Sequence, residues 1–202
     1  MELRRAIESR RMTRDFDPSE LDVDVLVDLV DLASRAPSAG KTQGWSLLVL
    51  RGSARDEFWN MSLPVDKRAG FAWPGLLRAP VVALSFADPD AYVARYSEPD
   101  KAHTGLGGGV DKWGAPYWTI DASMATMTFL LAAHDAGLGA LFFAVFNREE
   151  EIRAHFGVPK ALQLLGAIAV GYPAATASGS RRGASAPRPR RSPTEIIHVD
   201  RW

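Results

Sequence analysis

The sequence contains no cysteine, and this absence removes several kinds of chemistry at once. Disulfide bonds, thiolate nucleophiles and cysteine-ligated metal sites are all excluded. An excess charge of either sign is also missing, because 24 Lys and Arg residues balance 24 Asp and Glu residues. A general polyanion-binding surface is therefore not expected, and any basic site must be local.

Long apolar runs are missing as well. No stretch of the chain reaches the roughly 20 residues that a membrane-spanning helix requires. The first residues, Met1 to Arg5, carry charge instead of the apolar core of a secretory signal. We therefore expect a soluble, cytoplasmic protein. Its 202 residues, of which 47% are apolar, are enough to fill one core, so the expected organisation is a single domain over 1–202.

Apolar periodicity predicts helices that alternate with short strands. The expected helices are 2–9, 22–36, a segment that begins at Ala54 after a Ser53 cap, 121–136, and 147–156 with Asn147 and Glu150 as a capping pair. The expected strands are 45–50, 81–86, 141–146, 164–170 and 196–199. The helix over 121–136 is apolar almost all round, which is typical of a helix inside the core.

Two stretches break this pattern. Residues 88–116 are rich in proline, glycine, tyrosine and charge, so we expect a long stretch that is partly loop, and such loops are usually functional or disordered. Residues 176–193 contain five arginines, three prolines and no acidic residue, which indicates an arm outside the core. The strand-like residues 196–199 follow this arm, and such a strand can pair with a partner subunit.

Two basic segments are candidates for binding a phosphate group. The first reads Arg10-Arg11-Met12-Thr13-Arg14 and offers three guanidinium groups. Each of them can bind two phosphate oxygens at once and cannot lose its positive charge. Paired with Asp15 and Asp17, the same residues could instead form a solvated basic turn. The second reads Arg188-Pro189-Arg190-Arg191; taken alone, such a run is more often a disordered tail or a nonspecific polyanion patch.

A polar loop over 36–45 is the third candidate for ligand binding. Its small residues allow backbone amides to approach a ligand closely, and Gln43 offers both a donor and an acceptor to a heteroaromatic edge. The alternative is an ordinary turn in which Trp45 fills the core.

Taken in this order, the three segments resemble those of the nitroreductase family of flavoproteins. That family has an Arg-Arg-Ser-x-Arg-x-Phe signature, which stands here as Arg10-Arg11-Met12-Thr13-Arg14-Asp15-Phe16. It also has a Pro-Ser-x-x-Asn-x-Gln-Pro-Trp loop, which stands here as Pro37-Ser38-Ala39-Gly40-Lys41-Thr42-Gln43-Gly44-Trp45. Matching features continue at Gly137-Leu138-Gly139, at Gly171-Tyr172-Pro173 and at the basic arm. The resemblance spans nearly the whole chain, and only 88–118 has no clear match.

The resemblance implies an α+β fold, a nitroreductase-like three-layer sandwich in which a mixed sheet is flanked by helices. It also implies an intertwined homodimer, joined through the long central helix, whose subunits exchange C-terminal arms over 174–202. Two FMN molecules would lie at the interface, and 88–118 would form a variable cover over the active site. We expect no nucleic acid, membrane or metal partner.

By position, the resemblance assigns residues to each part of the cofactor. The phosphate and ribityl end would be held by Arg10, Arg11, Met12 and Arg14, together with Arg188 and Arg190 from the arm. The other subunit would supply Pro37, Ser38, Ala39, Lys41 and Gln43, while Ala144 and Val145 would lie beneath the ring. Several arginines suit an FMN phosphate, which carries close to two negative charges.

The sequence departs from the family at several of these positions. Met12 stands where Ser is usual, Lys41 where Asn is usual and Gly44 where Pro is usual. Before the second strand, where relatives often carry an amide and a lysine near the flavin, this chain reads Phe71-Ala72-Trp73-Pro74. A polar partner for the pyrimidine edge is therefore missing, and Lys41 could replace it by offering positive charge to a reduced ring.

Three aromatic residues, Trp113, Tyr117 and Trp118, precede or begin the long central helix. In relatives this region covers the open flavin face, so these rings could bind a flat substrate or nicotinamide by stacking. Packing in the dimer interface is the alternative. The histidines, which are His103, His134, His155 and His198, show no metal-ligand spacing and are expected to be structural or exposed.

The leading functional hypothesis is an FMN-dependent oxidoreductase. In a ping-pong cycle NADH or NADPH would reduce the flavin, and a flat electrophile such as a nitroaromatic, a quinone or an activated alkene would take the electrons. Because the cofactor supplies the chemistry, no acid, base or nucleophile needs to stand out, and no catalytic residue is assigned. Two alternatives stay open: a flavin or deazaflavin binding or storage protein of the same fold with little turnover, and a relative that fragments flavin with oxygen.

Overall fold

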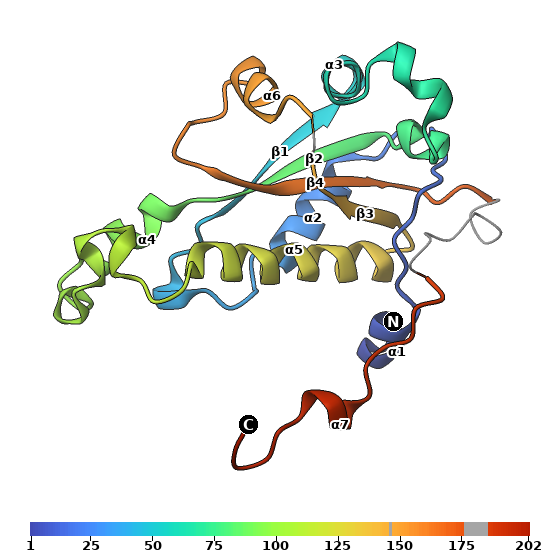
Figure 1. Cartoon of the computed structure of the whole chain (residues 1–202). Coiled ribbons are helices and arrows are strands. Elements are labelled where there is room, and N and C mark those ends of the chain that lie inside the picture. The colour runs from blue at the N-terminus through green and yellow to red at the C-terminus, as the bar shows by residue number, and fades with distance from the viewer. Residues whose placement is uncertain (146, 176–185) are drawn as a thin grey trace.

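The centre of the protein is an antiparallel sheet that lies between helices. The computed structural model describes residues 1–145, 147–175 and 186–202, and within these residues the sheet has four strands in the order β1-β2-β4-β3 (Figure 1). The strands are β1 (Trp45–Arg51), β2 (Val81–Ala87), β3 (Gly139–Phe143) and β4 (Gln163–Gly171). The helices are α1 (Leu3–Ser9), α2 (Val23–Ala33), α3 (Gly52–Ser62), α4 (Pro89–Tyr96), α5 (Tyr117–Asp135), α6 (Glu149–His155) and α7 (Pro193–Ile196).

Alternating side chains along β2 face two different apolar layers. Val82, Leu84 and Phe86 pack with Phe58 and Trp59 of α3 and with Ile152 of α6, whereas Val81 and Ala83 pack on the opposite side of the sheet with α2 and α5. The second layer is filled from the helices by Leu26, Leu29, Ala33, Phe129, Leu130 and Ala133. Both faces of β2 are therefore buried, which explains a sequence that is apolar except for Ser85.

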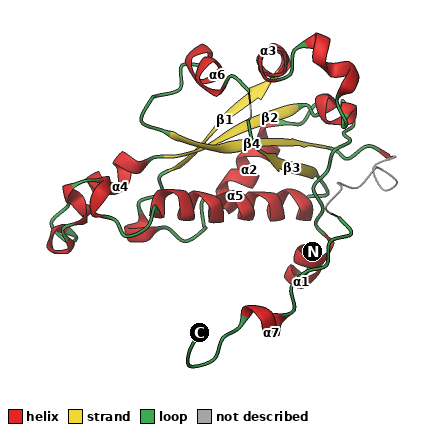
Figure 2. Ribbon diagram, viewed as in Figure 1, coloured by secondary structure: helices red, strands yellow, loops and turns green. Residues whose placement is uncertain are grey.

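The α+β sandwich expected from the resemblance is confirmed. Helices α2 and α5 cover one face of the sheet and α3 and α6 cover the other (Figure 2). Neighbouring strands pair antiparallel throughout the described sheet. Met12, which lies outside the four strands, adds an isolated parallel bridge to Ala140 of β3. A second bridge joins Phe16 to Pro173, so residues 12–16 run beside the sheet as extended chain.

Helix α5 organises the site described below, because both groups of candidate residues contact it. It has 19 residues, begins at Tyr117 rather than at the predicted residue 121, and runs along the sheet (Figure 1). Small residues such as Ala122, Ala125 and Ala133 allow it to approach the strands closely. In the described part of the chain, no helix combines the length and the apolar character needed to cross a membrane.

Two predicted helix caps are wrong. Helix α3 begins at Gly52 with Arg51 as its N-cap, so Ser53 lies inside the helix instead of capping it. Helix α6 begins at Glu149 after Arg148, whose backbone is left-handed with a φ of 56°. This left-handed residue separates Asn147 from the helix, and Asn147 therefore does not act as the cap.

The strand predicted over 196–199 is also wrong. Pro193–Ile196 form helix α7, because a proline suits the first turn of a helix and the carboxylate of Glu195 accepts a hydrogen bond from the Ser192 N–H at 2.6 Å. The stretch 88–116 contains helix α4 and several 3-10 turns, so it is only partly loop. Phe146, which ends the strand predicted over 141–146, and residues 176–185 of the predicted arm lie outside the described residues.

Candidate functional site

The first group of candidate residues lies where α1 ends. Arg10 follows α1 directly, and its Nε and Nη1 atoms are buried with no hydrogen-bond partner among the described residues. Burial lowers the pKa of Arg10, and the positive charges of Arg11 and Arg190 lower it further. Arg190 belongs to the C-terminal arm, which passes beside α1 (Figure 1). The fold thus brings two basic segments together that are far apart in the sequence, and such a cluster favours an anion.

The other arginines of these segments are less constrained. Arg11 is exposed and donates to the carbonyl oxygen of Glu8 at 2.7 Å. Arg188 is also exposed, in the same arm as Arg190. Both can therefore turn toward a ligand with little rearrangement of the core.

Arg14 lines a cavity of about 340 Å³ between β3 and the segment around Trp73. Its guanidinium carbon lies 5.1 Å from the centre of the Trp73 ring, and its Nη1 atom donates to the Met12 carbonyl at 3.1 Å. Ala144 and Val145, which follow β3, line the same cavity. The remaining walls are mostly aromatic or aliphatic and include Phe58, Trp59, Leu63, Phe71, Leu76 and Phe143.

Trp59 of α3 also lines this cavity. Its side chain is 5% exposed and its Nε1 atom is buried with no hydrogen-bond partner among the described residues. Its ring stacks on Phe143 with a centroid distance of 5.8 Å. The cavity therefore combines flat apolar walls with one charged donor, the Arg14 guanidinium.

The arginine cluster and the cavity are joined by a short length of extended chain. Residues 10 and 14 are four positions apart, which corresponds to about 13 Å when the chain is extended. This arrangement suits an elongated ligand with an anionic group at one end and a flat ring at the other.

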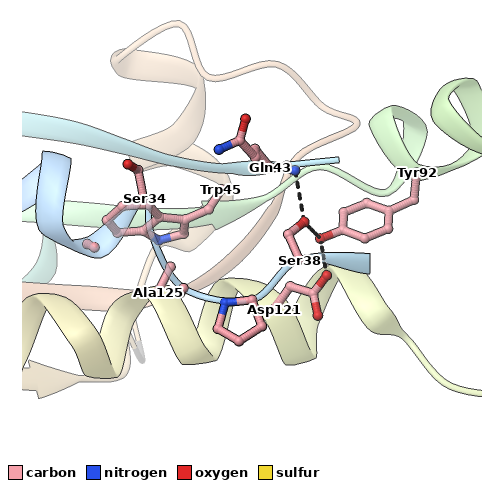
Figure 3. Close-up of a pocket in the computed structure, with 11 residues that line it drawn as sticks. Ser34, Ser38, Gln43, Trp45, Tyr92, Asp121 and Ala125 are labelled. Carbon is pink, nitrogen blue, oxygen red and sulfur yellow. Dashed lines mark hydrogen bonds between the residues drawn. The ribbon is translucent and has the colours of Figure 1, made fainter. Parts of the chain in front are cut away.

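The second group of candidate residues is the loop over 37–43, at the opposite end of α5. The backbone N–H of Ala39 donates to Oδ2 of Asp121 at 2.7 Å, and the N–H of Gln43 donates to Oγ of Ser38 at 2.9 Å. Figure 3 shows Ser38, Gln43 and Asp121 around a small hollow of about 50 Å³, with the side-chain amide of Gln43 turned away from it. Lys41 and Gln43 are exposed, so both are free to meet a ligand outside the loop.

Tyr92 of α4 completes this group. Its hydroxyl donates to Oδ2 of Asp121 at 2.7 Å and lies 3.4 Å from Oγ of Ser38. Burial raises the pKa of the Tyr92 hydroxyl well above its ordinary value, and the Asp121 carboxylate contributes to the same shift. Tyr92 is therefore a neutral donor at every ordinary pH.

A single chain does not bring the two groups together. Ser9, beside the arginine cluster, contacts His134 of α5 with 2.7 Å between Oγ and Nε2, whereas the loop contacts Asp121. These two helix positions are 13 residues apart, or about 20 Å along the axis. The two groups therefore lie toward opposite ends of α5 in one chain.

The aromatic residues predicted to bind substrate lie near the loop and pack on one another. Trp113 contacts Tyr92, Tyr96, Tyr117 and Trp118 with ring centroids between 4.7 and 6.3 Å apart. Trp113 also donates from Nε1 to the Leu106 carbonyl at 3.1 Å. The Tyr117 side chain stays 43% exposed, so it is the member of this cluster with the most surface available to a ligand.

Sequence reasoning missed Tyr92, Asp121 and Trp59 as members of the two groups. A possible signal was Asp121, an acidic residue near the start of an otherwise apolar helix. Tyr92 carried no such signal, because it lies in the segment without a match in the resemblance. Among the described residues, no group of three or more His, Asp or Glu side chains could hold a metal ion.

A sequence profile described as "Nitroreductase family" matches residues 7–172 of the chain. The chain belongs to the nitroreductase family. Membership makes this protein an oxidoreductase. A protein of Methanothermobacter thermautotrophicus, provisionally named NADH dehydrogenase/NAD(P)H nitroreductase, is 28% identical over 177 residues, which cover 86% of this chain and 78% of that one.

Solved structures agree with the fold of this nitroreductase-family protein. A nitroreductase-like protein of Streptococcus mutans matches with a TM-score of 0.72 at 18% identity, over 96% of this chain and 95% of that chain. The nitroreductase CinD of Lactococcus lactis, solved with chloramphenicol, matches with a TM-score of 0.67 at 20% identity, over 95% of this chain and 100% of that chain. At these identities the likeness concerns the fold alone.

Proposed function

We propose that the protein binds FMN between two subunits and passes electrons from NADH or NADPH to a flat electrophile. The observation that carries this proposal is Arg10, whose buried donors have no partner among the described residues and whose neighbours are Arg11 and Arg190. An uncompensated cation is costly to bury, so a site of this kind is built for an anionic group. A phosphate ester meets that need with several acceptor oxygens.

The residues present fit the other parts of FMN as well. The cavity beside Arg14 has flat walls, which suit an isoalloxazine ring, and Arg14 supplies a positive charge within it. Phe71 and Trp73, from the segment where relatives often carry an amide and a lysine near the flavin, line the same cavity. The Arg14 guanidinium would supply the polar partner that this segment lacks. Lys41 would add a second cation from the loop of the other subunit. Thus Arg14 and Lys41 together would favour a reduced, anionic ring.

A homodimer is part of the proposal, since the two groups of residues are about 20 Å apart along α5 in one chain. The accessible surface is 12386 Å². A folded monomer of 22.0 kDa would have about 9,300 Å² by the usual scaling, so the excess suits a subunit that buries more surface in an assembly. Apolar side chains remain exposed on α1, on α5 and in the C-terminal arm, among them Leu3, Ile7, Ile120, Met127, Ile196 and Val199.

When bound, FMN supplies the capacity to accept a hydride from a nicotinamide and to deliver electrons to an acceptor. The chain's own residues then need only bind, orient and exclude water. Arg10, Arg11 and Arg190 would hold the phosphate, while Ala144 and Val145 would support the ring. The aromatic cluster around Trp113 and Tyr117 would form part of the cover and offer a flat surface to a second ligand. No acid or base is required from these positions.

The acceptor class follows from this flat, aromatic cover. Nitroaromatics, quinones and activated alkenes present a planar, electron-poor group that can lie against such rings. The relative CinD has been solved with chloramphenicol and with 4-nitrophenol, which supports nitroaromatics as the first acceptors to try. The naming of another relative as an NADH dehydrogenase/NAD(P)H nitroreductase supports a nicotinamide as the donor.

The test is a visible absorption spectrum of the purified protein with added FMN, followed by anaerobic NADH and NADPH. A bound, oxidised flavin that is bleached by either nicotinamide, and restored by 4-nitrophenol or a quinone, is the expected result. A bound flavin that stays oxidised with both donors would favour a flavin-storage role. Failure to bind FMN at all would overturn the assignment of the arginine cluster.

A further inference from the structure

The loop over 37–43 adopts a strained backbone. Gly40, Lys41 and Gln43 all have left-handed conformations, with φ values of 62°, 56° and 56°. Left-handed residues other than glycine cost roughly 1–3 kcal/mol each, and they persist only when the surroundings hold them. Hydrogen bonds within the loop hold part of this shape, such as those from the Lys41 N–H to the Ser38 carbonyl and from the Gln43 N–H to Ser38 Oγ, both 2.9 Å long. Contacts from α5 and α4 add support from outside the loop.

One part of the support comes from Asp121 of α5. Its side chain is buried, with 6% exposed, and its Oδ2 atom accepts the Ala39 N–H at 2.7 Å. The same oxygen accepts the Tyr92 hydroxyl, also at 2.7 Å (Figure 3). A buried carboxylate that accepts two donors gives stronger hydrogen bonds than a neutral acceptor would. Asp121 therefore ties the start of the loop to a core helix.

The other part comes from α4. Arg95 donates from Nε to the Gly40 carbonyl at 2.9 Å, and its guanidinium is held in turn by Asp100, 2.7 Å away. The rings of α4 also restrict the loop by contact, since a Cβ atom at Gly44 would lie 2.8 Å from the Tyr92 ring. This contact gives a physical reason for glycine at position 44, where the family usually has proline.

We propose that Tyr92, Arg95 and Asp121 form a clamp that holds the loop over 37–43 in its FMN-binding shape before the cofactor arrives. The three are positioning residues, and the inference rests on the proposed function. Two of them lie in α4, within the segment 88–118 that has no clear match in the family pattern. The support for the cofactor loop thus comes partly from a segment outside the family pattern.

The test compares Tyr92→Phe, Arg95→Met and a matched control, Thr126→Val. Thr126 is buried on the same helix as Asp121. Its hydroxyl donates to the Ala122 carbonyl at 2.8 Å and lies 3.1 Å from Ser85 Oγ. Removing this hydroxyl therefore breaks buried polar contacts that lie outside the loop over 37–43. Two quantities are measured: hydrogen exchange of the amides of Ala39 and Gln43 without flavin, and the Kd for FMN.

Both clamp variants should speed amide exchange in the loop and raise the Kd for FMN by about tenfold, as expected if only about a tenth of the molecules keep the binding shape. At saturating FMN, the kcat of Arg95→Met with NADPH and 4-nitrophenol should stay within about twofold, because the loop is then held by the cofactor. The control should be destabilised without a change in loop exchange or in Kd.

Each remaining outcome decides between the two proposals. Unchanged exchange and unchanged Kd in both clamp variants, or equal losses in Thr126→Val, would overturn the clamp and leave the proposed function intact. If the wild-type protein does not bind FMN, the proposed function fails, and with it the clamp's role in cofactor binding. The exchange comparison then still shows whether the clamp holds the loop.

Discussion

Replacing Arg10 with methionine should raise the stability of the apoprotein and weaken its binding of FMN. In the free protein Arg10 has two buried donors that no described residue accepts, and Arg11 and Arg190 repel it. An unsatisfied buried polar group costs about 1–3 kcal/mol, and the partial exposure of this side chain reduces that, so we expect a gain of up to about 1 kcal/mol. For a chain of this size the gain corresponds to roughly 2–4 °C in Tm.

With FMN bound, the order of stability should reverse. Loss of a charged hydrogen bond to the phosphate costs about 1.5–3 kcal/mol, which raises the Kd by roughly 10- to 150-fold. At a concentration of 100 times the wild-type Kd, FMN stabilises the wild-type protein by about 2.7 kcal/mol, whereas the variant would gain only about 0.3–1.4 kcal/mol. The bound variant is then less stable than the bound wild type.

The assays are urea unfolding with and without FMN, and calorimetric titration with FMN and with riboflavin, which lacks the phosphate. Riboflavin affinity should stay within about twofold while FMN affinity falls. The matched control is Arg4→Met in α1, the helix that Arg10 follows, since Arg4 has an 89% exposed side chain and, among the described residues, pairs with Glu8 in an i,i+4 contact. Equal losses for FMN and riboflavin, or an apoprotein destabilised by the Arg10 change, would refute the reasoning.

Three further predictions concern stability. Burial, followed by the charges of Arg10 and Arg11, lowers the pKa of His134. The neutral imidazole therefore contributes stability at a pH above the unfolded pKa of about 6.5, and this contribution is lost as the pH falls from that value through the lower pKa of the folded state. His134→Gln should flatten the pH dependence of urea midpoints between pH 8 and 5, and an unchanged profile would contradict the assignment. Lys41→Gly should raise the free energy of unfolding by about 0.5–1 kcal/mol, because glycine removes the left-handed strain at a φ of 56°. Its control is Lys160→Gly, where φ is not positive, and this change should lower the free energy of unfolding. Gly44→Ala should destabilise the protein by about 1–3 kcal/mol in the same assay, since the new Cβ would lie 2.8 Å from the Tyr92 ring and 3.1 Å from the Asp88 carbonyl oxygen. Gly70→Ala, where a Cβ meets nothing within 4 Å, is its control, and equal effects at positions 44 and 70 would show that the contact does not matter.

Short-range patterns in the sequence predicted most of the element types and indicated the segments that we propose to bind the ligand. Strand β2 was predictable because both of its faces are buried, which leaves a run that is apolar except for Ser85. Five residues, 10–14, were enough to indicate an anion site, since guanidinium groups bind phosphate wherever they gather. The strand predicted over 196–199 failed because apolar residues in an arm have no sheet to join within the chain, and the Ser192–Glu195 contact favours a helical turn there.

Only the tertiary structure decided which distant residues meet. Asp121 is 82 positions from Ala39 and 29 from Tyr92, and no local periodicity reports a contact over such separations. The approach of Arg190 to Arg10 likewise depends on the path of the arm past α1. The sequence could therefore indicate only candidate binding groups. Their distances, and the clamp that holds the loop, follow from the packing of α4 and α5, because burial and shape complementarity act between elements and leave no mark within a short segment.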